Sequence, residues 1–351
     1  MQRIVFTTTP GRIIDEIVHS ASPSSVIVLA DENTSRLVVP NIDSETVASA
    51  PVIIIAAGDE AKTITTASHV WDKLSALGAT RHSLLINVGG GMVTDLGGFA
   101  ASTFKRGIEF INVPTTLLGA VDASVGGKTG VNHGGFKNEV GVFNEARAVV
   151  LSTAFFNTLP QIELRSGYAE VLKHALLIGV DEVNRWLDYP IELFPYESNR
   201  LLGMIETGVN FKLHIVEQDP HEQGLRRCLN LGHTVGHAFE SFALMRGTPV
   251  PHGHAVARGL VAELILSHLK CGFDGSWLHR LAKRILALYG NQLFTCDDYP
   301  TLLNLMHHDK KSVHGEINCT LLTAPGQFVN DFTVEDSDMC TALDIYRDLM
   351  E

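Results

Sequence analysis

The first 150 residues alternate short, continuously apolar runs with longer segments of helical character. The apolar runs are rich in Val, Ile and Leu and cover residues 25–30, 52–56, 83–88 and 108–113. A strand that is apolar along its whole length is buried on both faces, which is typical of parallel strands covered by helices. The pattern therefore predicts a doubly wound α/β domain up to about residue 150.

The second half of the chain has a different periodicity. From residue 152 onward, apolar residues recur at spacings of three and four, as in amphipathic helices. We expect helices over residues 161–179, 199–217, 231–245, 254–270, 276–289 and 338–350. Only residues 316–322 predict a strand here. Because 351 residues also exceed the usual size of one hydrophobic core, we expect two domains, residues 1–150 and a mainly α-helical domain of residues 151–351.

The composition argues against several kinds of partner. A formal net charge of -12 opposes binding to nucleic acid or to an anionic membrane surface. No apolar run is long enough to cross a bilayer, and the first residues lack the apolar core of a signal peptide, so we expect a cytoplasmic protein. The five cysteines are widely and irregularly spaced, which predicts reduced thiols.

A glycine-rich segment, Gly89–Gly98, directly follows the third apolar run and leads into a helical stretch. Glycines at such a place let the backbone approach a pyrophosphate, and the amides of the helix N-terminus stabilise its charge. The segment thus indicates dinucleotide binding, although a triple glycine also suits a tight turn. Asp31, after the first run, and Asp59, after the second, stand where an acid contacts a cofactor or caps a helix.

Residues 126–129 read Gly-Gly-Lys-Thr and invite comparison with a nucleotide triphosphate loop. That loop requires another glycine five residues before Gly127, and Asp122 occupies the position. We therefore reject this interpretation. Lys128 is instead expected to present its charge to an anion or a reactive oxygen, with Asp122 holding it.

Histidines and one glutamate in the second half indicate a divalent metal site. His233 and His237 stand four residues apart, His252 and His254 follow, and Glu170 lies upstream. A catalytic zinc site typically has three such ligands and leaves the remaining position to water or substrate. The residues alone leave open which imidazoles bind.

Other polar residues accompany these candidate ligands. Glu170 and Lys173 are three apart and share a helix face, either as a surface ion pair or as part of a site. A polar stripe on a helix and its approach comprises Glu222, Arg226, Asn230, His233 and His237. Such a stripe is either solvated or lines a cleft, and the neighbouring glycines favour the cleft.

Taken together, the motifs resemble those of the 3-dehydroquinate synthases, in register from about Asp31 to Lys311. They are Gly-Gly-Gly-x-x-x-Asp-Leu-Gly-Gly-Phe, Phe-Lys-Arg-Gly-Ile, Val-Pro-Thr-Thr-Leu-Leu, Val-Asp-Ala-Ser-Val-Gly-Gly-Lys-Thr-Gly-Val-Asn, Gly-Tyr-Ala-Glu-Val-Leu-Lys and Gly-Leu-Arg-x-x-Leu-Asn-x-Gly-His-Thr-x-Gly-His. The resemblance implies a Rossmann-like domain followed by a helical domain. It also implies a homodimeric cyclase of the shikimate pathway, which uses NAD and a divalent metal, zinc or cobalt. Such a cyclase converts 3-deoxy-arabino-heptulosonate 7-phosphate, a sugar phosphate, to 3-dehydroquinate and phosphate.

The resemblance also assigns roles to individual residues. The metal ligands would be Glu170, His233 and His252, so that His237 would contact the substrate phosphate and help to move a proton. The residues that hold NAD would be Asp31, Asn33, Asp59, Lys62, Gly89, Gly90, Gly91, Asp95, Thr115, Thr116, Lys137 and Thr158. Substrate contacts would come from Asp122, Lys128, Asn138, Lys173, Lys212, Arg226, Asn230 and one of Lys310 and Lys311. Arg106 would reach in from the other subunit, and Glu222 would accept a proton.

One departure from the family pattern affects the metal site. His254 stands where a glutamate often follows His-Gly, and it offers a second imidazole two residues from His252; we favour His252. Two other enzymes would share the cofactor motifs, namely another sugar phosphate cyclase and a metal-dependent polyol dehydrogenase. Arg226, Asn230 and Lys212 favour a carboxylated substrate over the substrates of other cyclases.

Overall fold

The computed structural model describes residues 2–134, 136–195, 198–308 and 316–350. The chain divides into two compact units. Unit 1 contains residues 1–160 and 194–209, and unit 2 contains residues 161–193 and 210–351. The division into domains at residue 150 stays a prediction. None of the helices in the described ranges combines the length and the apolar character that spanning a bilayer requires.

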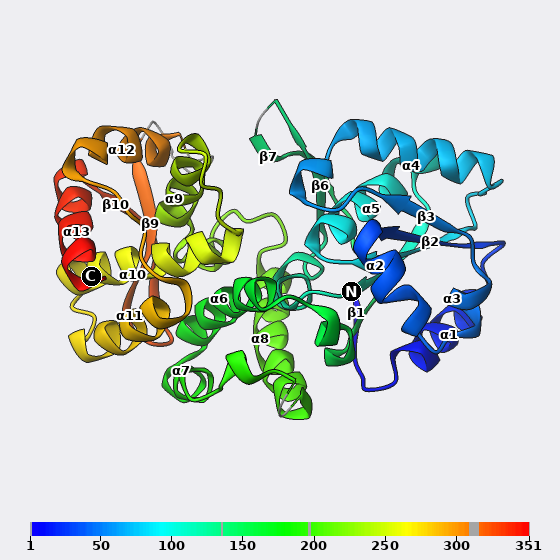
Figure 1. Ribbon diagram of the computed structural model, residues 1–351, viewed down its shortest axis with the longest axis horizontal. Helices are drawn as coiled ribbons and strands as arrows, with labels where there is room; N and C mark the ends of the chain where they lie inside the picture. Colours follow the sequence, from blue (N-terminus) through cyan, green and yellow to red (C-terminus); the bar gives the residue numbers. More distant parts are fainter. Residues whose placement is uncertain (1, 135, 196–197, 309–315, 351) are drawn as a thin grey trace. The chain divides into compact units, whose positions relative to one another are not determined.

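Unit 1 is built on a parallel sheet of six strands (Figure 1). In spatial order the strands are β1 (Arg3–Phe6), β8 (Ala148–Leu151), β5 (Glu109–Pro114), β4 (Leu84–Gly89), β2 (Val26–Asp31) and β3 (Val52–Ile55). Every residue of β4 and β8 is buried, so both faces of the central strands are covered. The predicted doubly wound α/β fold is confirmed, and the four expected strands lie within two residues of their predicted bounds.

Helices and one hairpin complete unit 1. The α-helices are α1 (Pro10–Ala21), α2 (Glu32–Leu37), α3 (Glu45–Ser49), α4 (Ile64–Ala76), α5 (Gly91–Thr103) and the N-terminal part of α8 (Ser198–Gln218), and the hairpin is β6 (Lys128–His133) with β7 (Phe136–Phe143). Helix α5 lies very close to the sheet, because a Cβ atom on Gly97 would stand 2.1 Å from the side-chain oxygen of Asn87 in β4. A glycine is therefore required at this helical position despite its low helix propensity.

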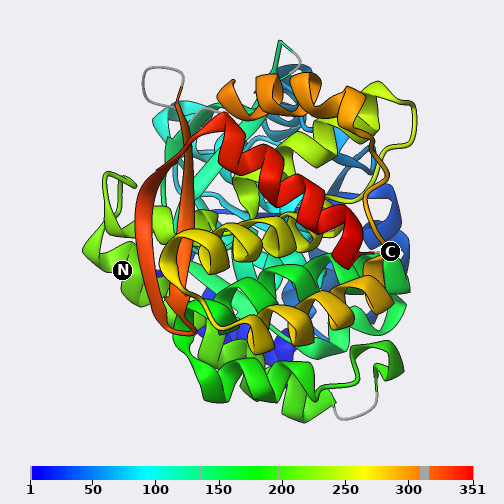
Figure 2. The ribbon, with the colours of Figure 1, turned by 90° about the vertical axis from the view of Figure 1, so that its left-hand side faces the viewer.

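Unit 2 is mainly α-helical, as expected. Its helices are α6 (Gln161–Ile178), α7 (Val180–Leu187), the C-terminal part of α8 (Ser198–Gln218), α9 (His233–Met245), α10 (His252–Cys271), α11 (Gly275–Tyr289), α12 (Tyr299–His307) and α13 (Asp336–Leu349). Helix α10 is buried along most of its length and packs against α6, α9, α11 and α13 (Figure 2). A helix that is apolar on all sides is typical of the centre of a helical core.

The expectation of a single strand in the second half is wrong. The strand expected at residues 316–322 forms as β9 (Ile317–Ala324), and it pairs with a second strand, β10 (Gln327–Val334), in an antiparallel hairpin. The side chains of β10 alternate between exposed and half-buried rather than between exposed and fully buried. An apolar alternation strong enough to predict a strand is therefore missing from its sequence.

Candidate metal centre and nucleotide-binding edge

Three helices of unit 2 bring one carboxylate and two imidazoles together. Glu170 lies on α6, and His233 and His252 are the first residues of α9 and α10. The Nε2 atoms of both histidines stand 3.5 Å from the same oxygen, Oε1 of Glu170. Ligands bound tetrahedrally to zinc at the usual bond lengths lie about 3.3–3.6 Å apart. The three donor atoms therefore have the spacing of a divalent metal site.

The other ring nitrogen of each histidine already has a partner. His233 Nδ1 lies 3.2 Å from the carbonyl oxygen of Leu231, and His252 Nδ1 lies 3.1 Å from Oε2 of Glu240. An N–H donated at Nδ1 leaves the lone pair of Nε2 for a metal, which is the usual arrangement around metal-binding histidines. Glu240 was missed in the sequence, although its position three residues after His237 on a predicted helix was a usable signal.

The two other candidate histidines, His237 and His254, lie in different surroundings. His237 belongs to the same cluster, since one ligand atom from each of His233, His237 and His252 lies within 4.8 Å of the others. His254 does not, because its Nε2 contacts the carbonyl oxygen of Ile162 at 3.1 Å and its ring packs edge-on against Tyr289. On a helix, residues two apart point about 200° away from each other, so His252 and His254 cannot both face one ion.

Glu170 is the electrostatic centre of the cluster. It is completely buried, and its Oε1 atom accepts no hydrogen bond from any described residue. Its other oxygen, Oε2, lies 2.5 Å from Nζ of Lys173, which is also buried. Burial favours the protonated acid, but Lys173 and the two histidines outweigh it and hold the pKa of Glu170 well below its usual value. The interpretation of Glu170 and Lys173 as a surface ion pair is therefore wrong.

The imidazole of His252 responds to the same charges. Burial disfavours its protonation, but the carboxylates of Glu170 and Glu240 more than compensate and raise the pKa of His252 to about 9. Glu170, with its deprotonated carboxylate and an oxygen that accepts no hydrogen bond, is thus prepared to bind a cation. An ion at this point would take the place of the proton on His252.

Small residues allow the three ligand-bearing helices to approach one another. A Cβ atom on Gly253 would stand 1.9 Å from the carbonyl oxygen of Ser166 in α6, and one on Gly259 would stand 2.2 Å from that of Gly232. The buried carboxylate of Glu263, on α10, accepts the amide hydrogens of Gly232 and Val235 and so caps the start of α9. These contacts fix the position of His233, and none of them was predicted from the sequence.

The segment before α9 carries the residues expected to bind substrate. Arg226 is buried and donates through its guanidinium to the carbonyl oxygen of Pro220 at 2.8 Å. Asn230 donates to Oε1 of Glu222 at 3.1 Å. The segment is not α-helical, because Leu225–Asn230 forms a 3₁₀ helix and α9 begins only at His233. The regular spacing of the polar stripe therefore does not reflect one helix face.

The remaining basic candidates in the second half differ in their surroundings. Lys212, on α8, is buried with 6% of its surface exposed. Lys310 and Lys311 lie outside the described residues. Burial raises the pKa of the Cys228 thiol, close to Arg226 in sequence, to about 12.

In unit 1, the glycine-rich segment lies where the strand order of the sheet reverses. Strand β2 is followed by β3 on one side, while β4 and β5 continue on the other, so the switch falls between β2 and β4. Ligands of doubly wound sheets bind beyond the carboxyl ends of the strands at such a point. Gly89 ends β4, Gly90 caps α5 and Gly91 begins it, and the first-turn amides of the helix face this edge.

The loop after β5 packs against the same turn. Thr115 donates its amide hydrogen to the carbonyl oxygen of Gly89 at 2.9 Å, and a Cβ atom on Gly90 would stand 2.9 Å from Cγ2 of Thr116. This close packing explains why a side chain is excluded at residue 90. The residues present thus fit a dinucleotide, since they combine a helix N-terminus with a turn of three glycines, of which Gly90 is partly exposed.

A second polar cluster lies beside α5. The buried Nζ of Lys62 is 2.6 Å from Oδ2 of Asp95, and it also donates to Oδ1 of Asn138. Lys137, from the same strand as Asn138, pairs with Asp59 at 3.3 Å. The structure therefore brings together Lys62 and Asp95, expected to hold NAD, with Asn138, expected to contact substrate.

Other residues expected near NAD or substrate have local structural roles or are exposed. Asp31 caps α2, accepting the amide hydrogens of Asn33 and Thr34, as one of its two interpretations predicted. Asn33 and Lys128 are exposed, Asp122 is half-buried, and Thr158 is exposed at the end of a 3₁₀ helix.

Arg106 stands in an unusual backbone turn. Lys105, Arg106 and Gly107 follow one another with positive φ angles of 50°, 70° and 112°. Arg106 lines an open surface hollow of about 930 Å³ together with Lys105 and Arg81. Arg106 is exposed on this turn.

Comparison with known proteins decides the family. Residues 52–166 match the model of the 3-dehydroquinate synthase N-terminal domain, and residues 167–312 match that of the C-terminal domain. The chain belongs to the 3-dehydroquinate synthase family. The family predicted from the sequence motifs, and with it the class of enzyme, is confirmed.

Individual relatives support the same assignment over nearly the whole chain. A 3-dehydroquinate synthase of Parabacteroides distasonis is 42% identical over 99% of this chain and 98% of its own length. One of Pyrococcus abyssi is 40% identical over 90% of this chain and 91% of its own length. Among solved structures, a 2-deoxy-scyllo-inosose synthase complexed with carbaglucose-6-phosphate, NAD+ and Co2+ matches with a TM-score of 0.82 at 22% identity, over 97% of this chain and 95% of that one. At this identity the match shows a common fold.

Proposed function

We propose that this member of the family converts 3-deoxy-D-arabino-heptulosonate 7-phosphate to 3-dehydroquinate and phosphate, with bound NAD and a divalent metal, zinc or cobalt. One observation carries the proposal beyond family membership, namely the shared contact of His233 and His252 with the buried Oε1 of Glu170. A carboxylate oxygen in this environment, with two imidazole nitrogens at tetrahedral spacing, favours a cation as its natural partner.

When both are bound, NAD would accept and return a hydride at one substrate alcohol, and the divalent metal would lower the pKa of the hydroxyl groups that it binds. The residues of this chain would supply the remaining functions. Glu170, His233 and His252 would hold the metal. Glu240, through Nδ1 of His252, and the Leu231 carbonyl, through Nδ1 of His233, would orient the imidazoles.

Residues around the metal centre would bind the substrate and move its protons. Lys173, Lys212 and Arg226 are cations with at most 6% of their surface exposed, in a chain of formal net charge -12. Buried cations favour anionic partners. We assign them to the carboxylate and phosphate of the substrate, together with Asn230, Asn138, Asp122, Lys128 and one of Lys310 and Lys311.

Proton transfer would fall to two residues of the segment that leads into and forms α9. Glu222, which accepts a hydrogen bond from Asn230, would take up a proton. His237 would contact the leaving phosphate and pass a proton to it, and it would not bind the metal. These assignments give three metal ligands, Glu170, His233 and His252, and two acid–base groups, Glu222 and His237.

The cofactor would lie along the carboxyl edge of the sheet in unit 1. Its pyrophosphate would meet Gly89, Gly90 and Gly91, where the first-turn amides of α5 are available. The other proposed contacts are Asp31, Asn33, Asp59, Lys62, Asp95, Thr115, Thr116, Lys137 and Thr158. We accordingly assign NAD binding to the domain of residues 1–150, and metal and substrate binding to that of residues 151–351.

We also propose a homodimer in the cytoplasm, in which Arg106 contributes to the site of the other subunit. The exposure of Arg106, on a turn of three successive positive φ angles, supports this role. Analytical ultracentrifugation gives the oligomeric state. Mixing Arg106→Ala subunits with subunits that lack a metal ligand then tests whether activity is restored between subunits.

The direct test of the proposed reaction is phosphate release from the heptulosonate phosphate. With NAD at a concentration far below that of the substrate, we expect each NAD to support many turnovers without accumulation of NADH. We also expect activity to be lost in the presence of a chelator. Stoichiometric NADH production would indicate a dehydrogenase instead.

Arg226→Ala should raise the KM for substrate by about thirtyfold or more, the loss expected for a charged contact, with little change in the KM for NAD. Equal activity on a substrate without the carboxylate would point to a different sugar phosphate cyclase.

A further inference from the structure

The β9–β10 hairpin contains a bulge that has no counterpart in the sequence motifs. The register between the strands breaks between Val329 and Phe332, so that Asn330 and Asp331 together oppose the single residue Thr320. Asp331 has a φ angle of +52°, in the left-handed region. Bulges redirect side chains out of the regular alternation of a strand, and they recur beside functional sites.

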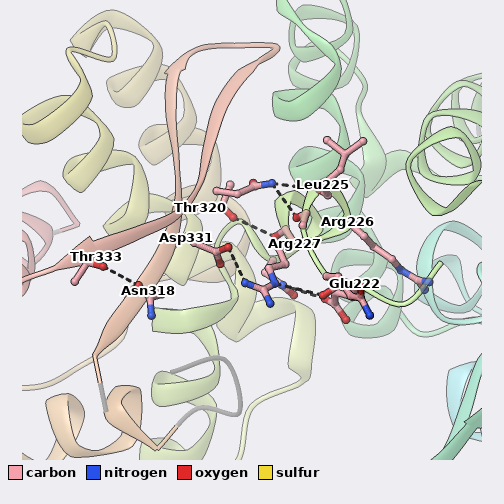
Figure 3. A network of polar contacts seen from close by, with 12 residues as sticks. Glu222, Leu225, Arg226, Arg227, Asn318, Thr320, Asp331 and Thr333 are labelled. Atoms are coloured by element: carbon pink, nitrogen blue, oxygen red, sulfur yellow. Dashed lines mark hydrogen bonds and ion pairs between the residues drawn. The ribbon is translucent and has the colours of Figure 1, made fainter. Parts of the chain in front are cut away.

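The bulge and the residue opposite it contact the segment that precedes α9 (Figure 3). Asn330 donates from Nδ2 to the carbonyl oxygens of Gly224 and Leu225, at 3.2 and 3.3 Å. Thr320 donates from its hydroxyl group to the carbonyl oxygen of Arg227 at 3.1 Å. Three carbonyl groups within residues 224–227 thus accept hydrogen bonds from the hairpin.

Asp331 reaches the same segment through a side chain. Its Oδ2 atom lies 2.7 Å from NH1 of Arg227, and Nε of Arg227 donates to the carbonyl oxygen of Glu222 at 3.3 Å. The side chain of Glu222 in turn accepts a hydrogen bond from Asn230. A continuous series of contacts therefore connects the bulge with Glu222.

The backbone at Glu222 explains why such support is needed. Glu222 has a φ angle of +58°, which non-glycine residues rarely adopt and which persists only where neighbouring contacts enforce it. The ion pair of Arg227 and Asp331 is half-exposed, so its charge alone contributes little to stability. Its effect is geometric, because it fixes the guanidinium that holds the Glu222 carbonyl.

We propose that Thr320, Asn330 and Asp331 form a brace of positioning residues, which holds residues 222–227 so that Glu222 and Arg226 are aligned for the substrate. The inference rests on the proposed function for these two residues. None of the three brace residues is required to touch substrate, NAD or metal.

The kinetic test uses variants of the brace and a matched control on the same hairpin. Asn330→Asp places an acceptor opposite two carbonyl oxygens. We expect the KM for substrate to rise about five- to tenfold, which corresponds to the loss of one or two hydrogen bonds. Asp331→Ala should have a larger effect than Asp331→Asn, because Asn tolerates the left-handed backbone. The control is Thr333→Val, since the Thr333 hydroxyl donates to the Asn318 side chain at 3.0 Å and no described residue of the segment 222–227 is its partner. It should leave the KM unchanged, and all variants should keep the wild-type zinc content and KM for NAD.

Hydrogen–deuterium exchange gives a readout that does not depend on the reaction. In the brace variants, amides of residues 219–230 should exchange faster than in the wild type and in Thr333→Val, while those of α10 should not change. Unchanged exchange in this segment would overturn the inference whatever the activity. If exchange responds but the wild-type protein releases no phosphate from the heptulosonate phosphate, the brace stands as a structural device and the proposed function fails. A variant that unfolds is replaced in both measurements by Asp331→Asn, which preserves the bulge.

Discussion

The two candidate cofactor sites are built in opposite ways. At the nucleotide-binding edge of unit 1, the sheet supplies the site through backbone, with strand ends, a glycine turn and the amides of α5. At the metal centre of unit 2, buried or half-buried side chains supply it, and each of them contacts another group that orients it. Steric changes should therefore damage the first site most, and changes of charge or hydrogen bonding should damage the second.

The largest expected effect falls on the metal centre. His233→Ala removes one of the three metal-binding atoms, and we expect the variant to lose its bound metal. Its kcat/KM should fall by about a thousandfold or more, a rise of about 4 kcal/mol in the activation free energy. Metal analysis and phosphate release measure the two effects. His254→Ala is the matched control, because His254 contacts Ile162 and Tyr289 instead of the cluster. Loss of metal in the His254 variant would show that the ligand set is wrong.

The second effect concerns packing at the nucleotide-binding edge. Gly97→Ala would place a Cβ atom 2.1 Å from the Asn87 side-chain oxygen and 2.8 Å from Leu29. We expect it to lower the free energy of unfolding by about 3 kcal/mol, the upper range for overpacked cores. Gly203→Ala, on α8, meets no atom within 4 Å and should instead stabilise by about 0.5–1 kcal/mol. Urea unfolding compares the two, and equal effects would contradict the packing argument.

The third effect separates the two sites functionally. Asp95→Ala removes the carboxylate that pairs with the buried Lys62 and disturbs the cluster beside α5. We expect a roughly thirtyfold weaker affinity for NAD, about 2 kcal/mol, with unchanged zinc content. Calorimetric titration of NAD and metal analysis test this. A variant that loses zinc but binds NAD normally would refute the assignment of the two sites to separate units.

A smaller effect follows from the protonation of His252. Its pKa is raised to about 9, and a metal requires the neutral imidazole. The proton is bound below that pH and competes with the metal, so apparent zinc affinity should rise with pH, about tenfold or 1.4 kcal/mol per unit, and level off near pH 9. Competition with a chelator between pH 6 and 9 measures the slope. Affinity independent of pH over this range would show that His252 is not displaced by the metal.

Much of this architecture could be predicted from the sequence. The continuous apolar runs located four strands, and the helical periodicity located six helices, because both patterns report burial directly. Two other strands give a weaker signal. Strand β8 has only four residues, and β10 is interrupted by the polar pair Asn330 and Asp331, which the bulge requires.

The site residues, too, could be predicted only in part from the sequence. Motifs pointed to Glu170, His233 and His252 as ligands, and the structure brings these three together, while their role as ligands stays a prediction. The sequence could not separate His252 from His254 by spacing, because the choice depends on where α10 begins and which way each ring points. Glu263 and Glu240 were missed because both act on other residues, through contacts between helices that no local pattern encodes.

X-ray absorption at the zinc edge tests the central claim most directly. The zinc-loaded protein and its His237→Ala variant would be compared. We predict the same spectrum for both, with two imidazole nitrogens and one carboxylate oxygen at about 2.0–2.2 Å. Three imidazole ligands in the wild type that fall to two in the variant would instead assign the ion to His233, His237 and His252, and would contradict the role given to Glu170.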